Sequence, residues 1–136
     1  MNRRLFGSLI VMAMAMGLAV NAGAQQRARA DVPFDFVVGD KVLSAATYDI
    51  SSVAANALVI RARDGKSALF QIQPADAKYS MQAMLVFHKY GDRYFLYQIW
   101  DADRHGIQLR ESKLEREQKL ASNSNVVPQE VVLALR

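Results

Sequence analysis

A hairpin signal in the second half of the chain constrains the fold more than any other feature. Two runs rich in aromatic and β-branched residues, 82–90 and 93–100, are separated only by a Gly-Asp dipeptide, which suits a two-residue turn with glycine first. Uninterrupted pairing across this turn sets Val86 opposite Tyr97, and both faces of the hairpin are then largely apolar. Because a surface hairpin has one polar face, we expect this one at the centre of the protein or inside a small barrel.

Further strand signals come before this hairpin and after it. The segments 57–63 and 67–73 flank Asp64 and Gly65, for which we expect a two-residue type I′ turn. Alternating apolar residues predict another strand over 32–38, with Pro33 at its start. Shorter runs that are typical of strands lie at 42–43, 47–50, 126–127 and 131–135.

One short helix is predicted near the C-terminus. Ser112 and Glu115 have the spacing of a capping box, in which the serine accepts from an amide three residues on and the glutamate reaches back. The helix should cover 113–121, with Glu115 paired to Lys119. The sequence therefore predicts a mainly β fold, an antiparallel meander that forms a small barrel or sandwich, with this one helix.

The first 24 residues have the three parts of a cleavable export signal, in the right order. Two arginines follow the first two residues, an uncharged apolar run covers 5–20, and Ala22 and Ala24 stand at the positions that a signal peptidase reads. The apolar run is shorter than the ~20 residues that span a bilayer. We therefore expect cleavage before Gln25 and a periplasmic or secreted protein with no membrane span after cleavage.

Composition narrows what the remaining 112 residues do. We interpret 25–31 as a flexible leader and 32–136 as a single β domain. Loss of the signal lowers the formal net charge from +4 to +2. This positive charge is too small and too dispersed to indicate a nucleic-acid-binding protein. The absence of cysteine excludes disulfides, thiol catalysis and cysteine-type metal sites.

Three segments carry a resemblance to a known family. They are PFDFVVGDKVL with the following Thr47-Tyr48, then LVFHKYGDRYFLYQIW at 85–100, and the charged run at 112–117. With these segments the chain resembles a family of small, exported, functionally uncharacterised bacterial proteins. The resemblance implies export and a single β domain, and it implies no activity, ligand or cofactor.

One loop has a partial metal motif. Asp101, Asp103 and His105 follow the spacing of the first positions of a calcium loop, but the fifth position needs an oxygen donor and the twelfth, Ser112, needs a carboxylate. Asp and Gly are also ordinary turn residues between a strand and a helix. A zinc site would have to borrow His88, and no phosphate loop or nucleophile elbow occurs. We expect no metal and no cofactor.

Aromatic and basic side chains on one face of the central hairpin are the candidate ligand-binding residues: His88, Tyr90, Arg93 and Tyr97. Tyrosine combines an apolar ring with a polar tip, which suits ligand surfaces, although such a face is more often plain core. We expect a non-catalytic binding or structural module of the cell envelope or secreted fraction, whose partner is a small apolar ligand, a glycan or a protein. The alternative is a small extracytoplasmic hydrolase or metal-dependent enzyme that uses the loop from Asp101 to His105.

Overall fold

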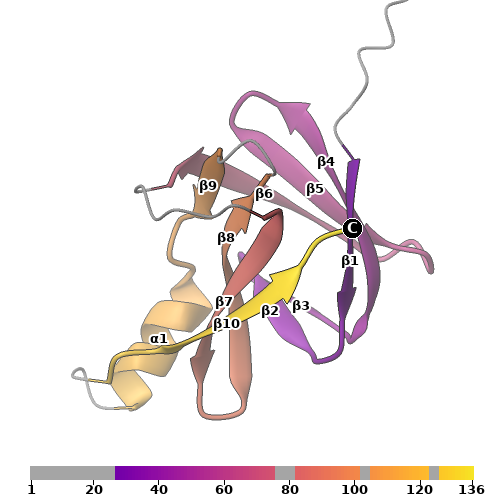
Figure 1. Cartoon of the computed structure of the whole chain (residues 1–136). Helices are drawn as coiled ribbons and strands as arrows, with labels where there is room; N and C mark the ends of the chain where they lie inside the picture. The colour runs from indigo at the N-terminus through magenta and orange to yellow at the C-terminus, as the bar shows by residue number, and fades with distance from the viewer. Residues whose placement is uncertain (1–26, 76–81, 102–104, 123–125) are drawn as a thin grey trace, which may run out of the picture.

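The computed structural model describes residues 27–75, 82–101, 105–122 and 126–136. Within these ranges ten strands form one mixed sheet, and a single α-helix follows the ninth strand (Figure 1). In chain order the elements are β1 Arg27–Val32, β2 Phe36–Val38, β3 Lys41–Leu43, β4 Ala46–Ala54, β5 Ala57–Ala62, β6 Ser67–Pro74, β7 Met84–Tyr90, β8 Arg93–Trp100, β9 Gly106–Leu109, α1 Lys113–Ala121 and β10 Gln129–Ala134. The prediction of a mainly β fold with one short helix near the C-terminus is confirmed.

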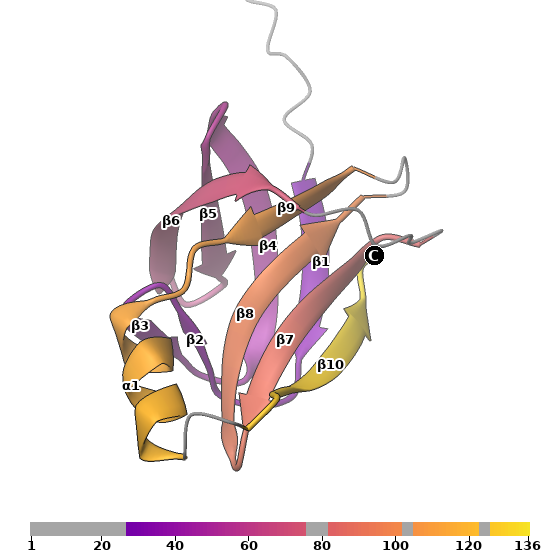
Figure 2. The ribbon, with the colours of Figure 1, turned by 90° about the vertical axis from the view of Figure 1, so that its left-hand side faces the viewer.

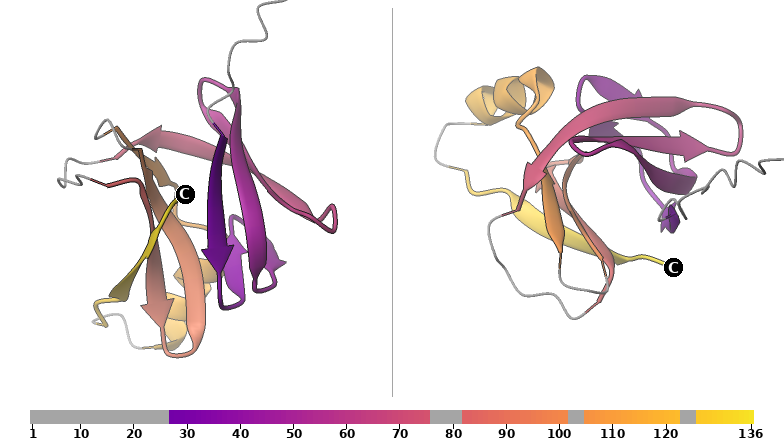
Figure 3. Two further views of the ribbon diagram at one scale, coloured as in Figure 1. Left: turned by 45° about the vertical axis from the view of Figure 1, so that its right-hand side comes forward. Right: turned by 90° about the horizontal axis from the view of Figure 1, so that it is seen from above.

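The sheet is bent into two facing layers. Its order runs β1-β4-β5-β6-β9-β8, after which β7 pairs with β8 and β10 pairs with β7, all antiparallel. The first five residues of β6 pair with β5 and its last three pair with β9, so this strand crosses from one layer to the other (Figure 3). The β2–β3 hairpin joins β8 through a short parallel pairing.

The two ends of the sheet meet at one pair of residues. The amide of Arg136 donates to the carbonyl of Arg29 at 2.9 Å, and the amide of Arg29 donates to the carbonyl of Arg136 at 3.2 Å. No ladder of strand pairing continues from β10 to β1 within the described residues, so the sheet is not closed into a barrel. Of the two predicted architectures, the sandwich is the closer description.

The main core lies between the two layers. Aromatic rings from three segments meet there edge to face, with the Phe87 ring 5.1 Å from Phe34 and 5.5 Å from Phe36, and with Phe36 5.2 Å from Tyr48. A second, smaller cluster of Val37, Tyr90 and Phe95 lies on the opposite face of the β7–β8 hairpin. Both faces of this hairpin are therefore covered, as its apolar pattern predicts.

Helix α1 lies beside the turn end of the hairpin (Figure 2) and contacts its outer face through Glu115, whose carboxylate reaches His88 and Tyr90. It begins where the capping box predicts, and its first amides include that of Glu115, which donates to the Ser112 hydroxyl at 3.1 Å. The expected pairing of Glu115 with Lys119 is wrong, because Lys119 pairs with Glu111 at 2.6 Å. No helix in the described ranges has the length and apolarity to span a membrane.

The expected flexible leader is wrong for residues 27–31. These residues form most of β1 and pair with β4, so the folded domain starts before residue 32. Ala30 and Val32 face the core while Arg29 and Asp31 face outward, a period-2 pattern that small alanine side chains conceal in the sequence. The predicted export signal, residues 1–24, lies outside the described residues.

The turn between β5 and β6 is one residue longer than predicted. The Gly65 amide donates to the Ala62 carbonyl at 3.1 Å and the Ala62 amide donates to the Lys66 carbonyl at 2.8 Å, so the loop contains three residues. Gly65 has a φ of 90°, which a β-branched side chain does not tolerate. The loop is thus a turn followed by a glycine bulge, and the expected type I′ turn is wrong.

The β7–β8 hairpin keeps the predicted turn but changes register halfway along. Phe87 pairs with Leu96 as expected, whereas Val86 pairs with Gln98, which leaves Tyr97 as the extra residue of a β-bulge. The predicted pairing of Val86 with Tyr97 is therefore wrong. A bulge of this kind redirects the side chains that follow it, and here it places both Tyr97 and Gln98 on the face of His88.

Candidate functional site

The predicted ligand-binding residues gather on the outer face of the β7–β8 hairpin. The rings of His88 and Tyr97 stack with their centroids 3.8 Å apart, and the Tyr90 ring lies edge-on to His88 at 6.4 Å. Arg93 stands at the turn end of the same face. The sequence thus placed these four side chains together correctly.

A buried glutamate from α1 closes this cluster. The Glu115 Oε1 atom lies 2.9 Å from His88 Nδ1 and accepts a hydrogen bond from the Tyr90 hydroxyl at 3.1 Å. Burial, and after it the charge of Glu115, raises the pKa of Tyr90, so its hydroxyl stays a neutral donor. The sequence did not predict this role of Glu115, because the capping-box pattern assigned its carboxylate to the start of the helix.

Helix α1 therefore covers two of the residues that were expected to face a ligand, His88 and Tyr90, while Arg93 at the edge of the helix is exposed. Tyr90 is only 2% exposed, and Arg93 donates to Gln118 of the helix at 3.4 Å. A ligand reaches Tyr90 only by displacing α1. The ligand role of these residues stays a prediction, and their observed contacts are those of a helix-docking face.

Asp101 and His105, the two described residues of the partial metal motif, contact each other. The backbone amide of His105 donates to Asp101 Oδ1 at 2.9 Å, and His105 Nδ1 lies 3.5 Å from Asp101 Oδ2. His88 pairs with Glu115 and not with this loop. The loop lies beside Met84 at the start of β7, and His88 is four residues, or about 13 Å, further along the strand. Asp103 lies outside the described residues, and among those described no three acidic, histidine or cysteine side chains gather around a metal position.

A pocket of about 410 Å³ opens between the two layers, at the end of the sheet where β8 stops and β9 starts. Six strands or their ends supply its larger apolar side chains, and Ala28 and Ala83 add smaller surfaces. All six larger residues belong to the main core or pack against it, so the floor of the pocket is the core itself. The larger apolar residues are Ile50, Leu58, Ile72, Ile99, Ile107 and Leu135.

The polar side chains of the pocket stand at its mouth. The side chain of His105 is 81% exposed and that of Asp101 40%, whereas Ile50 is 3% exposed. Arg136 also borders the pocket but directs its guanidinium to the carboxylate of Asp31, a residue on the outer side of β1. The interior of the pocket is therefore aliphatic and its entrance is polar.

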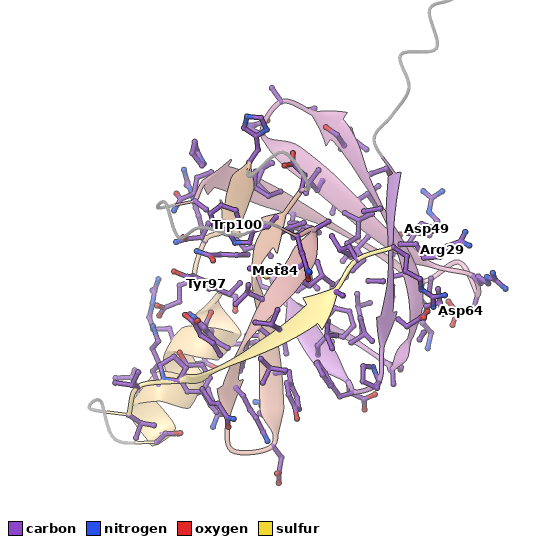
Figure 4. All side chains as sticks on the ribbon, viewed as in Figure 1. Arg29, Asp49, Asp64, Met84, Tyr97 and Trp100 are labelled. Carbon is purple, nitrogen blue, oxygen red and sulfur yellow. The ribbon has the colours of Figure 1, made fainter. Side chains whose placement is uncertain are left out.

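One wall of the pocket is held rigidly from outside. The Trp100 indole donates to Gln98 at 3.1 Å, and Gln98 donates to Gln108 of the neighbouring strand at 3.2 Å. A β-carbon on Gly106 would lie 2.5 Å from the Trp100 ring, so this position requires glycine. Figure 4 shows Trp100 and Tyr97 following one another along the hairpin, far from the Arg29–Asp49 ion pair on β1 and β4.

Comparison of the chain with protein-family models, with curated proteins and with solved structures gave no match in any of the three. A function must therefore be argued from the side chains of the chain itself. Sequence reasoning missed the pocket because its lining comes from strands spread between β1 and the segment after β10, and no local pattern marks such a surface.

Proposed function

We propose that this chain is an exported, non-catalytic binding protein that takes up a small apolar ligand between the two layers of its sheet. The pocket of about 410 Å³ carries the proposal. Ligand sites in proteins are mostly concave, apolar cavities of ~300–1,000 Å³ with a few polar groups that orient the ligand. An aliphatic interior with Asp101 and His105 at its mouth has this construction.

The covered aromatic face is a weaker candidate for the same role. Its polar atoms already contact one another and Glu115, and within the described residues every buried side-chain nitrogen and oxygen has a partner. A ligand would have to replace these contacts, whereas the pocket offers apolar surface without breaking any. The pocket is therefore the site at which binding costs least.

Binding is tested with the neutral fluorophore N-phenyl-1-naphthylamine and the purified protein. Trp100 is the only tryptophan of the chain and borders the pocket, so its emission serves as an internal reporter of a bound probe. We expect saturable quenching of Trp100 with one probe per chain and a dissociation constant in the micromolar range.

Two alanine-to-phenylalanine variants make this test specific. Ala28→Phe places a ring in the pocket and should abolish binding, while Ala121→Phe adds the same ring at the exposed end of α1 and should leave binding unchanged. Thermal unfolding of both variants confirms that they are folded. Absence of saturable quenching in the parent protein, or equal binding by both variants, would contradict the proposed site.

Export is the second part of the proposal and has its own test. The basic start, the apolar run and the small residues at Ala22 and Ala24 support cleavage before Gln25, and β1 begins two residues later, at Arg27. Intact-mass measurement of the protein recovered from the periplasm or the medium should therefore give a chain that starts at Gln25. Recovery of the full-length chain from the inner membrane would refute cleavage.

A further inference from the structure

We infer that the ligand of this pocket is a single alkyl chain of about a dozen carbon atoms that ends in a single polar head. This inference rests on the proposed function, since it concerns the same pocket. It adds the chemical class of the ligand, which follows from the lining, the placement of the polar side chains and the volume of the pocket.

The lining determines what the buried part of the ligand contains. The larger side chains inside are all isoleucine or leucine, and no phenylalanine or tyrosine borders the described part of the pocket. The Trp100 ring lies over Gly106, and its nitrogen is occupied by Gln98. A sugar or a nucleotide buried here would lose its hydrogen bonds to water and gain none, whereas a hydrocarbon loses nothing. The buried part is therefore a hydrocarbon without polar substituents.

The polar side chains at the mouth of the pocket indicate where the polar end of the ligand lies. Three polar side chains lie on the inward side of their strands next to the mouth. They are Ser52, Asp101 and His105, which stand two residues from Ile50, Ile99 and Ile107 respectively. Arg29 and Arg136 do not contribute, because both are turned to aspartates on the outer face of β1 and β4. A ligand that is apolar along its length and polar at one end matches this arrangement.

The volume of the pocket limits the length of the ligand's alkyl chain. At about 30 Å³ per heavy atom, the share of a water molecule in the liquid, 410 Å³ holds roughly fourteen heavy atoms, which is about a dozen carbons and a polar head. Membrane lipids carry two longer chains, which exceed this space, so a free single-chain amphiphile fits better. Affinity should rise with chain length until the pocket is full and then stop rising.

The test is displacement of N-phenyl-1-naphthylamine by straight-chain alkanols and alkanoates of about six to about sixteen carbons, each below its micelle concentration. Each added methylene should improve the inhibition constant roughly fourfold, the effect of burying one CH₂ group, up to a plateau near twelve carbons. The two head groups should show the same plateau, because the head remains at the mouth. Glucose at the same concentrations should not displace the probe.

Two pocket variants should move the plateau in opposite directions. Ile72→Ala enlarges the interior and should shift the plateau to longer chains by about two or three carbons, the volume of the atoms removed. Ile50→Phe should shift it to shorter chains. An affinity that is independent of chain length, a rise without a plateau, or a plateau that neither variant moves would overturn the alkyl assignment while probe binding persists. Failure of the probe itself to bind would instead refute the proposed function, and the inference with it.

Discussion

Truncation of Phe87 to alanine should lower the free energy of unfolding by about 3–5 kcal/mol. The side chain is fully buried at the centre of β7, and it contacts the rings of Phe34 and Phe36 edge to face. Its removal would leave a cavity between the two layers that aromatic neighbours from other strands cannot fill without moving. Urea unfolding followed by far-UV circular dichroism measures the effect.

Leu69 provides the matched control for this prediction. It is also an apolar strand residue, but it lies on the outer face of β6 and is 69% exposed. Leu69→Ala should change the unfolding free energy by no more than about 0.5 kcal/mol. If the two variants lost the same stability, the core could not lie between the layers as described.

Replacement of Glu115 by alanine should lower the free energy of unfolding by about 3 kcal/mol, although the residue lies on a short and mostly exposed helix. Glu115 is 5% exposed, and its carboxylate is the shared partner of His88 and Tyr90. Its loss would leave two polar groups under α1 without their acceptor. Since Leu114 supplies the other inward contact of the helix, α1 should also dock less firmly.

Glu117 allows the effect to be assigned to burial. It has the same side chain two residues along α1, is exposed, and lies 3.9 Å from Lys113 across a surface pair. Glu117→Ala should be nearly neutral, as surface ion pairs usually are. Glu115→Gln, which keeps an acceptor oxygen, should lose less stability than Glu115→Ala. Equal losses for Glu115→Ala and Glu117→Ala in urea unfolding would show that α1 is not anchored by this carboxylate.

Local signals in the sequence predicted the features that depend on neighbouring residues. The capping box at Ser112 located α1, because the cap and the amide that it binds are three residues apart. The turn between β7 and β8 was located by Gly91 and Asp92, because the hydrogen bonds of a two-residue turn also join residues that are close in sequence. The apolar faces of these strands also showed that the hairpin is covered on both sides.

Features that depend on distant residues were predicted poorly. Arg27 to Asp31 look polar when read alone, and only pairing with β4 shows that Ala30 lies inside. The bulge at Tyr97 was also missed, because a register shift is decided by how β7 and β8 pack against other elements. The candidate aromatic face was assembled correctly, but the sequence did not show that α1 lies over it.

The sequence by itself determined a β-rich chain without cysteine, the position of its helix and the existence of its central hairpin. The tertiary structure alone decided that the helix would cover His88 and Tyr90 of the aromatic face and that a pocket would open at the other end of the same hairpin. The physical reason is the range of the interactions. Caps and two-residue turns satisfy hydrogen bonds within a few residues, whereas a pocket exists only where side chains from β1, β4, β5, β6, β8 and β9 fail to fill the space between two layers.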